Sequence, residues 1–136
     1  MFFEPLNWIA VAIAFVASSV LAGLYFGVII AKPYVVALGR QDAPKPASSM
    51  VRNLGPVVCT LVVTITSAVL LRALDVTTIP DALVFGLIVG IGYLAAMTFQ
   101  IAINPNVPRP ILYGLINAPY FVVSSLITSV ILVLLQ

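Results

Sequence analysis

The sequence predicts an all-α integral membrane protein, a bundle of four transmembrane helices. Of its 136 residues, 62% are apolar and 7% are charged, and the mean hydropathy is +1.22. In soluble domains about a quarter of the residues are charged. Four stretches are also apolar over the roughly 20 residues that a helix needs to cross about 30 Å of hydrocarbon. The chain is short enough to form a single transmembrane domain over residues 1–136.

The four predicted spans cover residues 5–30, 53–71, 82–103 and 111–135. A proline stands near the start of each span, at Pro5, Pro56, Pro80 and Pro110. The first turn of a helix does not need the N–H that proline lacks, so these positions indicate helix starts. Thr78 followed by Asp81 adds a capping-box pattern to the third span.

The connection over residues 31–52 reads as a polar loop, and its segment 34–38 is apolar enough to lie at the membrane interface. With four spans, this loop and the connection that holds Arg109 share one side of the membrane. That side carries five of the six basic residues. The positive-inside rule therefore predicts that the 31–52 loop is cytoplasmic and that both termini are outside.

Polar residues inside the spans recur at helical spacing, so each span is expected to turn one polar stripe toward the others. Span 4 carries Tyr113, Asn117, Tyr120, Ser124 and Thr128, and span 3 carries Tyr93, Met97, Gln100 and Asn104. Span 2 carries Asn53, Thr60, Thr64 and Ser67, and span 1 carries Asn7, Ser18 and Tyr25. Ten of these residues are the candidates for a polar interior: Tyr113, Asn117, Tyr120 and Ser124 in span 4, Tyr93, Gln100 and Asn104 in span 3, and Thr60, Thr64 and Ser67 in span 2.

Two interpretations of these stripes stay open. In the first, amides and hydroxyls hold a packed bundle together by hydrogen bonds worth about 0.6 kcal/mol each. In the second, the stripes line a hydrated path or a binding cleft. Pro119 leaves the Leu115 carbonyl without its helical donor in mid-membrane, and Asn117 stands nearby. Spare acceptors at a kink are a common ingredient of ligand sites.

Glycines four residues apart predict close packing of helices. Gly23 and Gly27 lie in span 1, and Gly86 and Gly90 lie in span 3. Small residues at this spacing let another helix backbone approach closely. The segments 23–27 and 86–90 also resemble each other, which raises the hypothesis of an internal duplication.

Several classes of function lack residues to support them. Histidine is absent, Cys59 is the single cysteine, and no ionisable acid or base lies in the middle of a span. We therefore expect no metal or other cofactor, no proton-coupled transport and no enzyme activity. The basic residues are scattered along the sequence, so nucleic acid is not an expected partner. The expected partners are the lipid bilayer and other membrane proteins.

Three short motifs resemble a mainly bacterial membrane-protein family known as domain of unknown function 1761. They are Leu6-Asn7-Trp8-Ile9-Ala10-Val11, then Gly23-Leu24-Tyr25 with Gly27 and Lys32-Pro33-Tyr34, and finally Ile116-Asn117-Ala118-Pro119-Tyr120. The resemblance covers nearly the whole chain. It implies four transmembrane helices in a bacterial inner membrane and no known activity.

Association is the function that these observations favour. The chain is expected to act as a homo-oligomer or as an accessory subunit of a larger membrane complex. The alternative is a channel or facilitator for a small neutral solute or ion, lined by the polar stripes. A bundle of four helices cannot enclose a wide pore alone, so oligomers are expected in either case.

The predicted topology can be tested with introduced cysteines. A cysteine replacing Ser48 or Ser49 should be shielded from impermeant thiol reagents in intact cells, because the basic loop is expected in the cytoplasm. A cysteine placed after Gln136 should be labelled. The opposite pattern would overturn the orientation.

Overall fold

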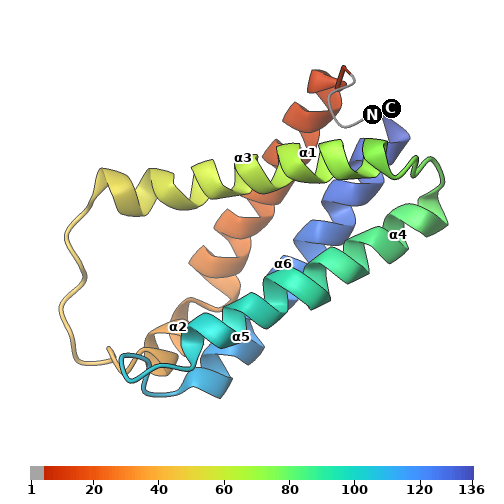
Figure 1. Ribbon diagram of the computed structural model, residues 1–136. Helices are drawn as coiled ribbons and strands as arrows, with labels where there is room; N and C mark the ends of the chain where they lie inside the picture. Colours follow the sequence, from red (N-terminus) through yellow and green to blue (C-terminus); the bar gives the residue numbers. More distant parts are fainter. Residues whose placement is uncertain (1–4) are drawn as a thin grey trace.

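The computed structural model describes residues 5–136, and over this part of the chain all regular structure is helical (Figure 1). The first span is α1 (Trp8–Leu24) continued by the π-helical η1 (Tyr25–Ile29), and the second is α3 (Met50–Ala73). The third consists of α4 (Ile79–Leu87), the π-helical η2 (Ile88–Ala95) and α5 (Ala96–Ala102), and the fourth is α6 (Pro110–Leu134). A short helix, α2 (Ala31–Ala37), follows the first span.

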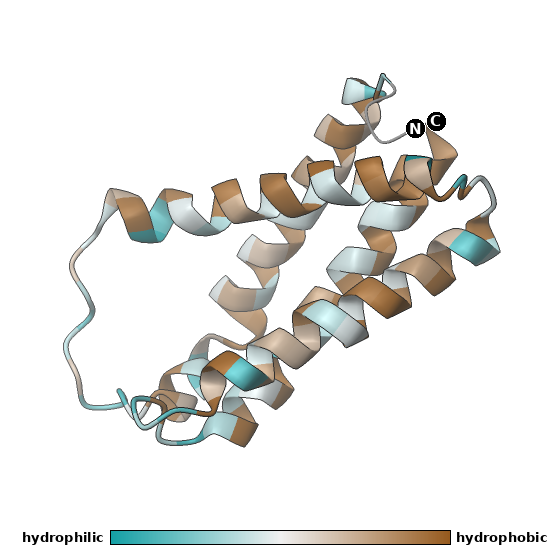
Figure 2. Ribbon diagram, viewed as in Figure 1, coloured by the Kyte–Doolittle hydropathy of each residue, from teal (hydrophilic) through white to brown (hydrophobic). Residues whose placement is uncertain are grey.

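The predicted fold class is confirmed, and the chain is a multi-pass membrane protein. Four helical spans, Trp8–Ile29, Met50–Ala73, Ile79–Ala102 and Pro110–Leu134, are long and apolar enough to cross a bilayer. Apolar residues lie on all sides of these helices, and most of the hydrophilic residues lie in the connections and near the helix ends (Figure 2). A helix that is apolar all round is expected where lipid is its solvent.

Helix α6 is the centre of the bundle, because it contacts all three other spans and α2. The apolar core lies at the end of the bundle where α1 begins and α6 ends, here called the terminal end. It is built from the start of α1, the end of α3, the start of α4 and the end of α6, and its members are Ala10, Val11, Ala14, Ala68, Leu71, Ala82, Phe85, Leu132 and Val133. The four spans are therefore packed most closely at this end.

Side-chain caps fix two of the helix starts at this end. The Asn7 Oδ1 accepts from the backbone N–H groups of Ile9 and Ala10, at 3.1 and 3.3 Å, and so caps α1. The Asn7 amide also donates to the Leu135 carbonyl, which ties the start of α1 to the end of α6. The predicted Thr78 cap of α4 is present, with the Asp81 N–H donating to the Thr78 hydroxyl oxygen at 3.3 Å.

Two predicted helix starts are wrong. Pro5 precedes the Asn7 cap, and Pro56 lies inside α3, which begins at Met50. Within a helix, proline leaves the carbonyl four residues earlier, here that of Arg52, without its helical donor. This carbonyl belongs to the first turn of α3, at the membrane interface, where water can supply the missing hydrogen bond. The segment 31–52 is also only partly a loop, since α2 and the first turn of α3 lie in it.

The first half of α3, Met50–Val63, separates from the rest of the bundle. None of these residues is buried, and the first buried residue of the helix is Thr64. From Thr64 onward, α3 packs through Ser67, Ala68 and Leu71. Helix α3 therefore joins the bundle only near the terminal end, and Figure 1 shows its other half diverging from α1.

The third span approaches α6 at backbone distance. A Cβ atom on Gly90 would lie 2.9 Å from the Cα atom of Val122, and one on Gly86 would lie 3.0 Å from the Cα atom of Leu126. Both glycines thus pack inside the chain. Gly23 and Gly27, the matching pair in span 1, are exposed and would meet no atom within 4 Å.

Replacing Gly90 by alanine should therefore destabilise the bundle. The new methyl group would overlap the α6 backbone, so we expect a loss of about 1 to 3 kcal/mol in unfolding free energy in mixed micelles. Gly23→Ala is the matched control, and it should leave stability unchanged or raise it by up to about 1 kcal/mol, because alanine favours a helix more than glycine does. Equal effects of the two substitutions would contradict the close approach at Gly90.

Candidate functional site

A set of polar side chains, here called the hydroxyl seam, joins the first span to α6. It consists of Ser18, Tyr25, Asn117, Tyr120 and Thr128. The Ser18 and Thr128 hydroxyl oxygens lie 2.9 Å apart, and the Tyr120 hydroxyl donates to the Ser18 carbonyl at 3.3 Å. The Tyr25 hydroxyl donates to the Ile116 carbonyl at 2.7 Å. These contacts join residues that are far apart in the sequence.

Asn117 is buried, with 3% of its surface exposed, but its partner differs from those expected. Its side-chain amide donates to the Tyr113 carbonyl at 2.7 Å, within α6, rather than to another helix or to the Leu115 carbonyl freed by Pro119. The reason is geometric. An asparagine side chain in a helix can reach back to the carbonyl four residues earlier, whereas Leu115 lies on the outer face, 60% exposed.

Aromatic rings extend the seam toward the end of the bundle opposite the termini. The Phe26 ring lies 4.9 Å from the Tyr120 ring and 6.3 Å from the Tyr34 ring of α2, and Tyr34 lies 5.6 Å from Tyr113, all between ring centroids. Burial raises the pKa of the Tyr34 hydroxyl to about 12, and its hydrogen bond with Tyr113 adds to the rise. Tyr34 therefore stays neutral at physiological pH.

The polar stripe expected in span 3 does not lie in the interior. Tyr93 is 69% exposed, and Gln100 and Asn104 are also exposed. Small residues occupy the inner face instead: Ala82, Gly86, Gly90, Ala95 and Ala102, at spacings of 4, 4, 5 and 7. The step of five falls in η2, because a π-helix has more residues per turn than an α-helix. Asn104 lies just after α5, and its side-chain amide donates to the Ile101 carbonyl of the last turn at 2.6 Å.

The stripes of spans 2 and 4 turn inward only in part. Thr64 and Ser67 are buried where α3 joins the bundle, and Thr60 is half-buried where α3 begins to diverge. The Thr60 hydroxyl donates to the Pro56 carbonyl, and Thr64 donates to the Thr60 carbonyl, so both bonds stay within α3. In span 4, Tyr113 and Ser124 are half-buried.

Helix α6 has a second inner face, formed by Ser125 and Ser129, that was not predicted from the sequence. Both are buried, and the Ser129 hydroxyl donates to the Ser125 carbonyl at 2.7 Å. A Cβ atom on Gly90 would lie 3.2 Å from the Ser125 Cβ. Ser125 and Ser129 are four residues apart, as Gly86 and Gly90 are. This shared spacing of small residues is the sequence pattern from which the contact between the two helices could have been predicted.

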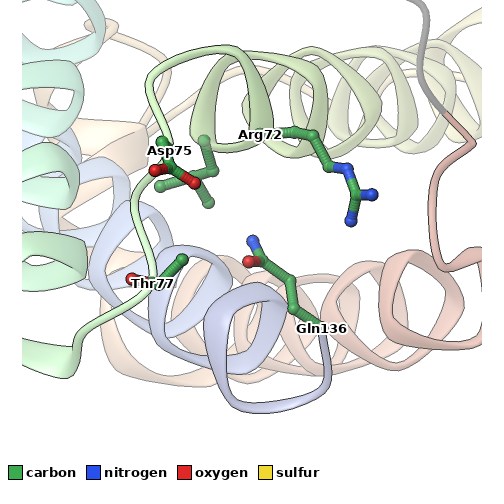
Figure 3. Close-up of a pocket in the computed structure, with 5 residues that line it drawn as sticks. Arg72, Asp75, Thr77 and Gln136 are labelled. Carbon is green, nitrogen blue, oxygen red and sulfur yellow. The ribbon is translucent and has the colours of Figure 1, made fainter. Parts of the chain in front are cut away.

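A hollow in the described chain lies away from the seam, where α3 and α6 end (Figure 3). It has a volume of about 210 Å³ and is lined by Leu71, Arg72, Asp75, Thr77 and Gln136. Asp75 stands in the left-handed backbone region with φ of 53°, at the turn that ends α3. None of the candidate interior residues lines this hollow, and its polar residues are exposed.

The chemistry of the seam is that of neutral hydrogen bonding. Its groups are hydroxyls, one amide and backbone carbonyls, each with a partner inside the chain. Within residues 5–136, no three histidine, cysteine or acidic side chains gather as a metal site would require. The arrangement can hold helices in register, and it offers no charged group to bind or activate a substrate.

Comparison with known families agrees with this architecture. Residues 9–133 match the family described as Protein of unknown function (DUF1761). The chain belongs to the DUF1761 family. No curated protein and no solved structure matches it.

The Tyr25 bond tests whether the seam stabilises this DUF1761 protein. Tyr25→Phe removes the donor to the Ile116 carbonyl and should lower the unfolding free energy by about 1 kcal/mol in mixed micelles. Tyr93→Phe removes the same hydroxyl group from an exposed position and should have no effect. A Tyr25→Phe protein as stable as the parent would show that the bond contributes nothing to the fold.

Proposed function

We propose that this DUF1761 protein acts by association within the membrane, as a homo-oligomer or as an accessory subunit of a larger membrane complex. The observation that carries the proposal is the first half of α3. Residues Met50–Val63 form about four helical turns, and none of them is buried by the rest of the chain. Such a segment offers a complete helix surface to another membrane helix.

The composition of this half-helix suits helix association. Lipid chains are as apolar as leucine, so membrane helices associate through close packing of small residues and through polar side chains. Gly55 and Cys59 are small residues four apart, and a Cβ atom on Gly55 would meet no atom within 4 Å. Asn53 and Thr60 supply polar groups on the same segment.

The first span offers a second free surface. Gly23 and Gly27 face outward, and the space beside both is open. Gly86 and Gly90 are occupied by α6 and are not available to a partner. Of the four glycines suggested by the sequence, the first two are therefore the ones that support a role in association.

The packing of the seam favours association over the channel alternative. Its hydroxyl and amide groups are bonded to each other or to backbone carbonyls at 2.7 to 3.3 Å, which leaves little demand for water. Among the side-chain nitrogen and oxygen atoms of the described residues that are completely buried, only the Ser19 hydroxyl oxygen lacks a hydrogen-bond partner. A path for a solute through one chain would require these contacts to open.

The proposal includes a location and an orientation. The protein would reside in a bacterial inner membrane with the connection between α1 and α3 in the cytoplasm and both termini outside, following the distribution of its basic residues. It would act without catalysis and without a cofactor.

Gly55→Ile tests the proposed surface. A branched side chain would hold a partner helix away from α3, so the fraction of oligomer or complex in mild detergent, measured by light scattering, should fall. Gly92→Ile is the matched control, because an added Cβ on Gly92, as on Gly55, would meet no atom within 4 Å, but Gly92 lies on the third span. An oligomer fraction unchanged by Gly55→Ile and by Gly23→Ile would contradict association through these surfaces.

A second test, cysteine scanning, separates association from a channel. Cysteines introduced at positions 113, 117, 120 and 124 of α6 should resist water-soluble thiol reagents if the interior of the bundle is packed. Modification of all four positions, together with solute flux in reconstituted vesicles, would favour the channel.

A further inference from the structure

Five basic residues that are scattered in the sequence lie in or beside the two connections, α1 to α3 and α5 to α6, that share one side of the four spans. These residues, here called the basic rim, are Lys32, Arg40, Lys45, Arg52 and Arg109. All five are exposed. They come from α2, from the connection after it, from the first turn of α3 and from the residue before α6.

Lys32, the first of these residues, lies in α2, which is packed against the bundle along one side. Ile30 and Ala37, at the two ends of α2, are buried. Between them, the Tyr34 ring packs against the rings of Phe26 and Tyr113. Because one side of α2 is held in this way, the exposed Lys32 side chain is directed away from the bundle.

The loop after α2 is held against the connection that precedes α6. Gly39 adopts a left-handed φ of 64°, and a Cβ atom placed on it would lie 3.1 Å from the Cγ of Pro108. Arg40 follows Gly39 in the chain, and Arg109 follows Pro108. The contact therefore brings two of the cations of the rim to neighbouring loops.

The rim carries an excess of positive charge. Asp42 is the one acidic residue in the connections at this end, and no ion pair neutralises the five cations within the described part of the chain. Three of the five cations stand at the end of a candidate span. Lys32 follows the first span, which ends at Ile29. Arg52 lies in the first turn of the second span, and Arg109 directly precedes the fourth. Exposed cations at the ends of spans lie at the level of the lipid headgroups.

We propose that the basic rim binds the headgroups of anionic phospholipids in the leaflet at that end of the bundle. Clusters of four to eight lysines and arginines beside a membrane span attract anionic lipids. Each basic residue adds a roughly equal share to the binding free energy. Charge complementarity and depth both fit this partner. This lipid binding does not depend on the proposed association. The rim and the first half of α3 are different surfaces that share only Arg52.

The test uses the full-length protein in phosphatidylcholine vesicles that contain spin-labelled lipids. Spin-labelled phosphatidylglycerol should associate with the protein at least about threefold more strongly than spin-labelled phosphatidylcholine. The preference should fall toward unity at about 1 M salt, where charges are screened within about 3 Å. Both leaflets contain the labels, so the orientation of the protein does not affect the result.

The triple variant Lys32→Gln, Arg40→Gln and Arg109→Gln should lose most of the preference. Its matched control, Lys32→Arg, Arg40→Lys and Arg109→Lys, changes the same positions, keeps the charge and should keep the preference. If the glutamine variant fails to fold, the pair Lys45→Gln and Arg52→Gln replaces it, with a smaller loss expected. Circular dichroism of each variant in phosphatidylcholine vesicles shows whether it is folded.

Three results would overturn the proposal. The first is equal association of the two labelled lipids with the parent protein, and the second is an unchanged preference in the folded glutamine variants. The third is a preference that inorganic phosphate abolishes while chloride of equal ionic strength does not, because the rim would then bind free phosphate rather than a lipid surface.

Discussion

The contact between the third span and α6 is the constraint on which the rest of the bundle depends. Lipid gives helices no hydrophobic reason to associate, so close packing must supply much of the attraction. Gly86 and Gly90 allow the α6 backbone to come within about 3 Å of where a Cβ would stand. With α6 held there, its other face is free to receive the first span.

The hydroxyl seam follows from that placement. Ser18 and Tyr25 of the first span meet Thr128, Tyr120 and the Ile116 carbonyl of α6. A neutral seam of this kind fixes the register of two helices without burying a charge, which would be costly in the membrane. The hydrogen bonds of the seam therefore serve to hold the first span and α6 together.

The two surfaces proposed for binding differ in chemistry. The first half of α3 is apolar with small and polar residues, which suits another helix, whereas the basic rim is charged and suits headgroups. Arg52 belongs to both, at the start of α3. A partner docked on this half-helix would therefore stand beside the lipid contacts of the rim.

The sequence by itself determined the four spans and the Thr78 cap, because span length and cap chemistry are local properties of the chain. It predicted an interior polar stripe in every span, and Asn117 and Tyr120 of span 4 and Thr64 and Ser67 of span 2 are buried. Only the tertiary structure decided that the stripe of span 3 faces outward, since the π-helical turn in η2 shifts the phase that sequence spacing assumes to be constant. Likewise, nothing in the spacing of Gly23 and Gly27 distinguished them from Gly86 and Gly90. Whether a small residue is covered depends on where a neighbouring helix lies, and long-range packing decides that.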